Sequence, residues 1–353
     1  MIRRRSSRPT TIILLILGMM AGVLAGCSSS DGTSGSDQAA GGSGTDTTAD
    51  PGVDASAFPV TIDHMLGEAT ITEPPQRIVA LGTLEQDILL ALGVTPVAMV
   101  ANPDDPDGVF PWAPDDLDVS EIEMLPMDTT ASSIERIAAL KPDLILATTA
   151  SADVSLYERY KDFGVPIVAP LTGPLNDPWQ DITVAVGRAI GREDAALELV
   201  AETEAAMERY VAELGGVEGL SFAVALASDA TQSRVVNKSI DTSARLFVEI
   251  GMVVPAGLEA LSSGTQVGAI DISHEEMGLL GEADAIFMAS VGDNRDVVES
   301  NPLFASLPAV RNGAYLPYDR EVAAGLRVPT PLSIPYVLEQ IRPTLEKAVA
   351  SQQ

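Results

Sequence analysis

The chain carries the same strand and helix plan twice, and this repetition limits the folds open to it more than any other feature. The segment 133–140 begins with Ser-x-Glu, continues as a predicted helix, and leads through an aspartate to the apolar strand 144–147. The segment 273–280 also begins with Ser-x-Glu and leads through a helix and an aspartate to the strand 285–288. Alternation of helices with short buried strands predicts parallel sheets covered by helices. Two copies of the plan therefore predict two similar α/β lobes.

Two predicted helix ends repeat in the same way. The helices 84–92 and 242–250 are followed by Gly93 and Gly251, at the position where a positive φ is favoured. A valine and then a proline follow each glycine, and we expect the proline to open the next strand. The two prolines are Pro96 and Pro255. The sequence also predicts a hairpin over 58–72 with its turn near Gly67, and buried strands over 77–81 and 222–226.

A long helical segment separates the two copies. We expect Asp177 to cap a helix that has Pro178 in its first turn and ends before Gly191. A second helix then runs over 192–214, and its roughly 23 residues correspond to about 35 Å. A helix of this length can fix the separation of two lobes. In open parallel sheets ligands bind beyond the carboxyl ends of the strands, so a cleft between the lobes is the expected binding site.

The amino terminus predicts export and a lipid anchor. Four arginines precede an apolar run over 11–23, and about 13 residues are too few for a helix that spans a membrane, which needs ~20. The run ends in Leu24-Ala25-Gly26-Cys27, which resembles the lipobox of bacterial lipoproteins. This resemblance implies cleavage after residue 26 and acylation of Cys27, with the alternative of an ordinary signal peptide followed by a chance cysteine. The protein would then be held at the extracytoplasmic face of the cell membrane.

Net charge and cysteine content limit the classes of partner that this chain can bind. Loss of the first 26 residues removes four arginines and no acids, which takes the formal net charge from -29 to -33. Such a chain repels nucleic acid and anionic lipid head groups, so we expect no nucleic-acid partner and membrane contact through the anchor alone. Cys27 is the only cysteine, which excludes disulfides from the folded part. The predicted division is a signal peptide over 1–26, a flexible tether over 27–57, a lobe over 58–176, a spine helix over 177–215 and a second lobe over 216–353.

Several segments in one order resemble a known family. They are FPVTIDHMLGEATI with PPQRIVALG, DILLALGVTPV, IERIAALKPDLILA, DPWQDITVAVGRAIGRED, NPLFASLPAVRNGAYLP and PLSIPYVLEQI. From Phe58 to about Ala350 the chain is similar to the substrate-binding lipoproteins of ABC importers, in the helical-spine class with the class III periplasmic-binding fold. The closest likeness is to iron-siderophore receptors. It implies a monomer without a resident cofactor that binds a Fe(III)-siderophore through its chelator and delivers it to ABC permease subunits. A receptor for haem or cobalamin with the same fold is the alternative.

The resemblance also implies two docking residues. In this family a surface glutamate on each lobe contacts arginines of the permease, and the motif positions are Glu135 and Glu275, with Glu276 in reserve. The competing interpretation is helix capping, because Ser132 with Glu135 and Ser273 with Glu276 both fit a capping box.

Candidate ligand residues follow the ends of predicted strands or lie in loops. A bulky chelate with oxygen-rich edges suits hydroxyl and arginine donors beside an aromatic wall. Trp112 fits either the cleft or simple packing, and any one of the arginines fits a surface role as well as a ligand contact. The candidates are Thr83, Trp112, Thr149, Arg234, Arg295 and Arg327.

Other chemistry has little support. The acidic loop 102–118 lacks the order of a calcium loop, so we interpret it as solvated. Neither His64 nor His274 has a metal or nucleophile partner by spacing, and the GxSxG, HExxH and GxxxxGK motifs are absent. We therefore expect no enzyme activity, and a lipid-anchored hydrolase built on either histidine is the distant alternative.

Overall fold

The computed structural model describes residues 52–126, 131–149, 154–173, 175–262 and 268–353, and all of them belong to one compact unit. The predicted signal peptide and Cys27 lie outside these residues. None of the described helices is both long and apolar enough to cross a membrane.

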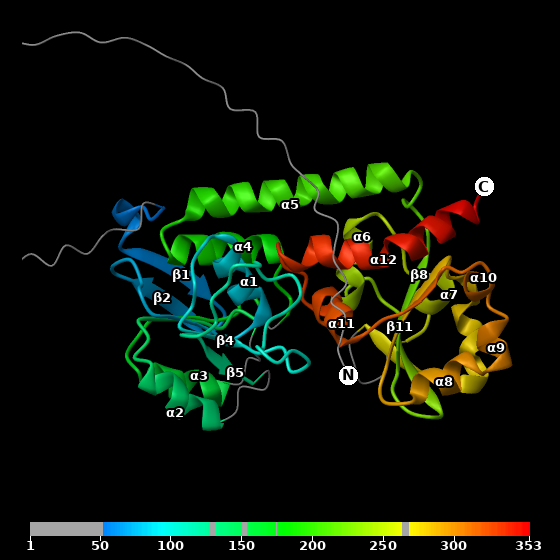
Figure 1. Cartoon of the computed structure of the whole chain (residues 1–353), viewed down its shortest axis with the longest axis horizontal. Coiled ribbons are helices and arrows are strands. Elements are labelled where there is room, and N and C mark those ends of the chain that lie inside the picture. Colours follow the sequence, from blue (N-terminus) through cyan, green and yellow to red (C-terminus); the bar gives the residue numbers. More distant parts are fainter. Residues whose placement is uncertain (1–51, 127–130, 150–153, 174, 263–267) are drawn as a thin grey trace, which may run out of the picture. The chain divides into compact units, whose positions relative to one another are not determined.

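The N-terminal lobe is built on an all-parallel five-stranded sheet (Figure 1). Its strands lie in the order β5, β4, β3, β6, β7, and the sheet is preceded by the antiparallel hairpin of β1 and β2. The strands are β1 (Val60–His64), β2 (Gly67–Ile71), β3 (Ile78–Ala80), β4 (Ala98–Val100), β5 (Glu123–Leu125), β6 (Leu144–Leu146) and β7 (Ile167–Val168). The helices are η1 (Ala55–Ala57), α1 (Thr83–Ala91), α2 (Ala131–Ala139) and α3 (Val154–Lys161). The three residues of β6 are fully buried, as a central parallel strand requires.

The C-terminal lobe has a mixed five-stranded sheet in the order β10, β9, β8, β11, β12. β8, β11 and β12 are parallel, whereas β9 and β10 add to the edge as antiparallel strands. The strands are β8 (Phe222–Ala227), β9 (Gln232–Val236), β10 (Ala269–Ser273), β11 (Ala285–Ser290) and β12 (Tyr315–Pro317). The helices are η2 (Thr242–Ala244), α6 (Arg245–Glu249), α7 (Ala256–Glu259), η3 (His274–Glu282), α8 (Asn294–Glu299), α9 (Pro302–Ala305), α10 (Pro308–Arg311) and α11 (Arg320–Arg327).

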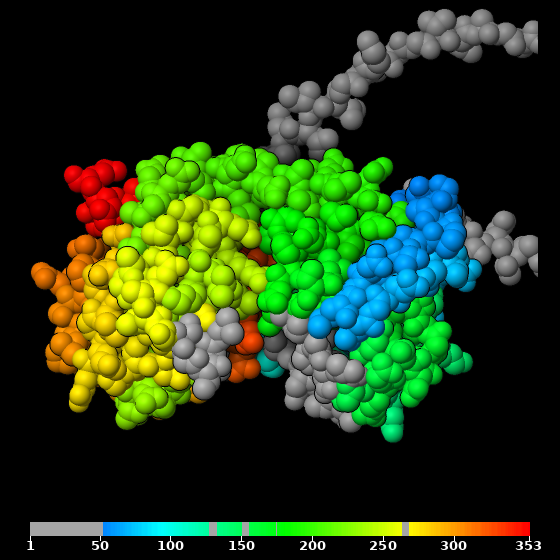
Figure 2. Space-filling view, turned by 180° about the vertical axis from the view of Figure 1, so that it is seen from behind, coloured from blue at the N-terminus to red at the C-terminus, as the bar shows by residue number. Residues whose placement is uncertain are grey.

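Three helices connect the lobes. α4 (Trp179–Ala189) turns at Gly191, whose φ is 70°, into the 22-residue α5 (Glu193–Leu214). The final helix, α12 (Ser333–Ala350), packs along α5, where the Tyr210 hydroxyl donates to the Leu338 carbonyl at 2.8 Å and Arg342 lies 4.5 Å from the Tyr210 ring centre. Figures 1 and 2 show α5 running along one side of both lobes. This is the predicted spine.

The segment expected to be the end of the tether contacts the spine. Asp54 caps η1 by accepting from the Ser56 amide at 2.9 Å, and its own amide donates to the Gly191 carbonyl at 2.9 Å. A side chain at Gly191 would meet Phe58 at 2.7 Å, so this corner needs a glycine both for its positive φ and for space.

Most local predictions are confirmed, and the exceptions have physical reasons. The hairpin, the buried strands and the positive φ of Gly93 and Gly251 all occur. Asp177, however, does not cap α4: its carboxylate accepts from the Leu171 and Thr172 amides, and Pro178 takes the N-cap position. Pro255 opens the short helix α7, not a strand. Residues 274–282 form a 3₁₀ helix, and the position predicted as a loop near Arg234 is the strand β9.

Candidate functional site

A small cavity of about 30 Å³ lies where the two lobes meet the start of α4. The N-terminal lobe contributes Leu84 of α1 and Thr149, which follows β6. The C-terminal lobe contributes Arg245 of α6 and Arg327 at the end of α11. Thr149 thus follows the carboxyl end of a strand, where the topology predicts ligand contacts. A cavity of this size holds little more than a water molecule, so a bulky ligand must displace part of its wall.

The position of Thr149 is set by a buried carboxylate. Glu85 of α1 is fully buried, and its two oxygens accept from the Thr149 amide and hydroxyl, each at 2.7 Å. A Cβ at Gly82 would lie 1.9 Å from the Thr149 hydroxyl, so this close packing needs glycine at the N-cap of α1. Burial raises the pKa of Glu85, while the hydrogen bonds from Thr149 oppose this effect.

Two arginines reach the cavity from the C-terminal lobe. Arg245 donates to the backbone carbonyls of Asp177 at 3.1 Å and Leu175 at 2.5 Å, and so ties α6 to the start of the spine. Arg327 is exposed, and within the described part of the chain it makes no ion pair with a carboxylate. Burial raises the pKa of nearby Asp241, and the positive charges of both arginines oppose this. Arg327 therefore has donors that an oxygen-rich ligand can use.

Trp112 is packed in the junction between the lobes. Its side chain is 8% exposed, its ring stacks on Phe110 at 4.9 Å, and it lies 5.5 Å from the ring of Tyr336 on α12. Its indole nitrogen donates to the Asp87 carboxylate at 2.7 Å. In this arrangement the side chain belongs to the packed interior and is absent from the wall of the cavity.

The other candidate ligand residues lie apart from the cavity or at its edge. Thr83 is half-buried at the first position of α1, beside Leu84. Arg234 pairs across the strands β9 and β10 with Asp271 at 3.1 Å. Arg295 pairs with Glu299 on α8 at 2.8 Å. The structure thus brings Thr149 and Arg327 together and gives Arg234 and Arg295 carboxylate partners of their own.

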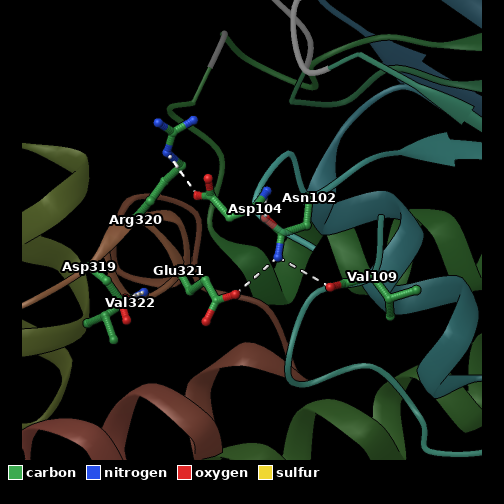
Figure 3. A network of polar contacts seen from close by, with 7 residues as sticks. All are labelled: Asn102, Asp104, Val109, Asp319, Arg320, Glu321 and Val322. Carbon is green, nitrogen blue, oxygen red and sulfur yellow. Dashed lines mark hydrogen bonds and ion pairs between the residues drawn. The ribbon is translucent and has the colours of Figure 1, made fainter. Parts of the chain in front are cut away.

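A polar network joins the lobes beside α11 (Figure 3). The Asn102 amide donates to the Glu321 carboxylate at 3.2 Å, and Arg320 pairs with Asp104 at 3.1 Å. The Asp319 carboxylate caps α11 by accepting from the Val322 amide at 3.0 Å. The start of the acidic loop 102–118 is therefore held against the opposite lobe. The sequence analysis interpreted the whole loop as solvated and did not predict this contact.

The two candidate docking residues are exposed, one on each lobe. Glu135 lies on α2, which Figure 1 shows at the end of its lobe farthest from α5. Glu275 lies in the first turn of η3, whose first residue, His274, donates its amide to Thr231 in the turn between β8 and β9. The capping box there uses Glu276, which accepts from the Ser273 amide at 3.0 Å. Glu275 therefore has no capping role.

Sequence reasoning missed three residues that shape the cavity: Glu85, Asp87 and Arg245. The first two had a readable signal, because the segment TLEQDILLA places two acids inside an apolar helix that must pack on a buried sheet. Such acids are buried only with partners or with an altered pKa. Arg245 had no comparable signal, since it differs from other surface arginines only through its tertiary contacts.

Comparison with known proteins agrees with this architecture. The sequence profile of a family described as periplasmic binding protein matches residues 78–319. The Bacillus subtilis (strain 168) protein YhfQ, assigned as an ABC transporter substrate-binding lipoprotein, is 25% identical over 322 residues, covering 88% of this chain and 91% of its own length. The Fe(3+)-citrate-binding protein YfmC of the same organism is 24% identical and covers 90% of this chain and 92% of its own.

A solved structure shares the fold. The crystal structure of PiaA from Streptococcus pneumoniae TIGR4, in complex with ferrichrome, superimposes with a TM-score of 0.68 at 26% identity. The match covers 82% of this chain and 99% of PiaA. Both lobes and the spine helix are thus those of a known class of binding protein, and the chain belongs to the periplasmic binding protein family.

Proposed function

We propose that this protein is a lipid-anchored receptor on the extracytoplasmic face of the membrane that captures a ferric siderophore and delivers it to an ABC permease. The observation that carries the proposal is that Thr149 and Arg327, from opposite lobes, line one cavity at the carboxyl end of a central strand. The names of its relatives support the iron cargo, since YfmC is a Fe(3+)-citrate-binding protein and PiaA was solved with ferrichrome.

The chemistry of the cavity suits an iron chelate. A siderophore presents oxygen atoms around iron, and these accept hydrogen bonds from a guanidinium group such as that of Arg327. Thr149 is held rigidly by Glu85, so its backbone is positioned before the ligand arrives. Arg327 is a flexible donor that can follow ligands of different outline. The iron is cargo in this proposal and is held by its chelator.

Anchoring and delivery complete the proposal. Cys27 would carry the acyl chains, and the segment between it and Gly52 would connect the anchor to the folded part. Glu135 and Glu275 would contact the permease, one from each lobe. These two side chains are exposed on separate lobes, and each could meet one subunit of a partner with two-fold symmetry.

The test is a titration of the purified protein with ferric hydroxamate, ferric catecholate, ferric citrate, haem and cobalamin, followed by tryptophan emission. The proposal expects saturable binding of at least one ferric chelate and none of the iron-free chelator at the same concentrations. Preferential binding of haem or cobalamin would overturn the assignment of the cargo. Ester or peptide hydrolysis that is lost in His64→Ala or His274→Ala would instead support the hydrolase alternative.

A further inference from the structure

Asp87 connects the two lobes from a buried position. Its side chain is 1% exposed on α1, and one carboxylate oxygen accepts two hydrogen bonds. The donors are the Trp112 indole at 2.7 Å, from the N-terminal lobe, and the Thr330 hydroxyl at 2.6 Å, from the segment between α11 and α12. Thr330 is itself fully buried and is fixed by reciprocal bonds with Ser333 at 2.9 and 2.8 Å.

The two segments that Asp87 connects form walls of the candidate ligand cavity. Leu84 lines the cavity three residues before Asp87 on the same helix. Arg327 and Pro329 line it from the other side, and Pro329 immediately precedes Thr330. A change at Asp87 therefore acts on both walls at once, although the carboxylate itself does not line the cavity.

The environment of Asp87 disfavours a negative charge. Within the described part of the chain its carboxylate has no arginine or lysine partner. The titratable group that acts on it is Glu85 on the same helix, which adds a like charge when ionised. From α12, Tyr336 contacts the Trp112 ring and not the carboxylate. Burial raises the pKa of Asp87 to about 7, and the hydrogen bonds from Thr330 and Trp112 limit the rise.

We propose that Asp87 is a proton-controlled pin between the lobes: neutral Asp87 keeps the cavity walls together, and its ionisation favours their separation and entry of ligand. The assignment of the cavity as the ligand site rests on the proposed function, but the behaviour of the pin does not. A buried carboxylate without a cation is costly, whereas a carboxylic acid with two donors on its carbonyl oxygen is tolerated.

The direction of the effect follows from linkage. Separation of the walls admits water to Asp87 and lowers its pKa toward the ordinary value, so opening releases a proton. The open form is therefore favoured increasingly as the pH rises from the ordinary pKa of an aspartate, 3.8, to about 7, by at most about tenfold per pH unit, and the effect levels off above that pH. The closed form is favoured in acid. A cavity of about 30 Å³ is what a closed form would contain.

The first experiment reads the pin without any ligand. The chain has two tryptophans, so Trp179→Phe leaves Trp112 as the only tryptophan, whose emission can be excited selectively at wavelengths that tyrosine does not absorb. Its emission should change between pH 4 and pH 8, with a midpoint no higher than about 7. Asp87→Asn, which imitates the neutral acid, should remove the change, whereas Glu85→Gln should keep it. A flat profile in the Trp179→Phe protein, or an unchanged midpoint in its Asp87→Asn derivative, would overturn the proposal.

The second experiment measures the separation of the lobes. Cys27 is the only cysteine, so a Cys27→Ser chain with Glu135→Cys and Glu275→Cys can carry one spin label on each lobe. The distribution of label distances should be broader and longer at pH 8.5 than at pH 5.5. Asp87→Asn should stay narrow at both pH values, and Thr330→Val, which removes the donor of the C-terminal lobe, should be broad at both. If the distribution of distances changes neither with pH nor with Thr330→Val, the proposed role of Asp87 is refuted.

The two proposals fail in different ways. If the emission and distance changes occur but no ferric chelate binds, the pin stands and the siderophore assignment falls. If a ferric chelate binds with the same association rate at pH 5.5 and 8.5 and the distances do not change, the receptor stands and the pin falls.

Discussion

Removal of Glu135 and Glu275, the proposed docking glutamates, is expected to stop uptake while leaving the isolated receptor intact. Glu135 and Glu275 are exposed, and neither side chain makes a hydrogen bond or an ion pair within the described part of the chain. The double Ala variant should therefore change the free energy of unfolding by less than about 1 kcal/mol, as surface substitutions do. Its affinity for the ferric siderophore should also be unchanged, because neither residue lines the cavity.

The double substitution should weaken only the binding of the receptor to the permease. Truncation of one side of a desolvated charge pair costs about 2 to 5 kcal/mol, and two distant contacts add. The double variant is then expected to lose about 4 to 10 kcal/mol of docking free energy, which is roughly a thousandfold or more in affinity. Uptake of labelled iron and growth on the ferric siderophore as sole iron source measure this loss, with membrane-bound protein quantified in parallel.

Glu276 is the matched control, because it has the same charge and lies next to Glu275. It completes the capping box with Ser273, so Glu276→Ala should lower the free energy of unfolding by about 0.5 to 2 kcal/mol and leave uptake by the folded protein normal. Normal transport by the Glu135→Ala, Glu275→Ala protein would refute the docking assignment. A loss of stability in that variant equal to the loss in Glu276→Ala would refute it as well.

Three further predictions concern the anchor, the spine and the buried acid. Cys27→Ser should move the protein from the detergent phase to the medium or leave an unprocessed precursor, and unchanged partitioning would refute the lipobox. Because α5 packs along α12 through Tyr210, ligand should change the radius of gyration in small-angle scattering only slightly, and a large compaction would contradict a rigid spine. Asp87 keeps its proton in the folded state up to about pH 7 but loses it near pH 3.8 in the unfolded state. Between pH 4 and pH 8 the free energy of unfolding of the parent should therefore fall by about 4 kcal/mol relative to that of Asp87→Asn. Chemical denaturation at both pH values measures this difference, and parallel curves would exclude the raised pKa.

The sequence predicted the fold well where local signals and global topology agree. The buried strands β6 and β11 are short apolar runs, and the glycines after α1 and α6 take the positive φ that ends a helix. The edge strand β10 and its neighbour β9 were missed because AIDIS and QSRVV mix polar and apolar residues. Their pairing depends on the neighbouring strand β8, which no local pattern reveals.

The candidate site was predicted less completely, for a related reason. Thr149 was identified because it follows a strand, and topology alone places that end at a cleft. Among the arginines, Arg295 pairs with Glu299 four residues later, a local contact that the sequence could have indicated. Only tertiary contacts, however, distinguish Arg327, which lines the cavity, from Arg234, which pairs with Asp271 on the next strand of the sheet. The junction between lobes joins residues about 240 positions apart in the chain, such as Asp87 and Thr330, and such contacts have no sequence pattern.

The central claim is that a ferric siderophore binds in the cavity between the lobes, and the affinities of two arginine variants test it most directly. Arg327→Ala removes a donor that lines the cavity, whereas Arg295→Ala removes the same chemical group from the surface of α8. Titration with the ferric siderophore that the parent binds should show a loss of about tenfold or more for Arg327→Ala, as removal of a charge-assisted hydrogen bond implies. Arg295→Ala should bind as the parent does. Equal affinities for the parent and Arg327→Ala, or a larger loss in Arg295→Ala, would contradict the placement of the ligand in this cavity.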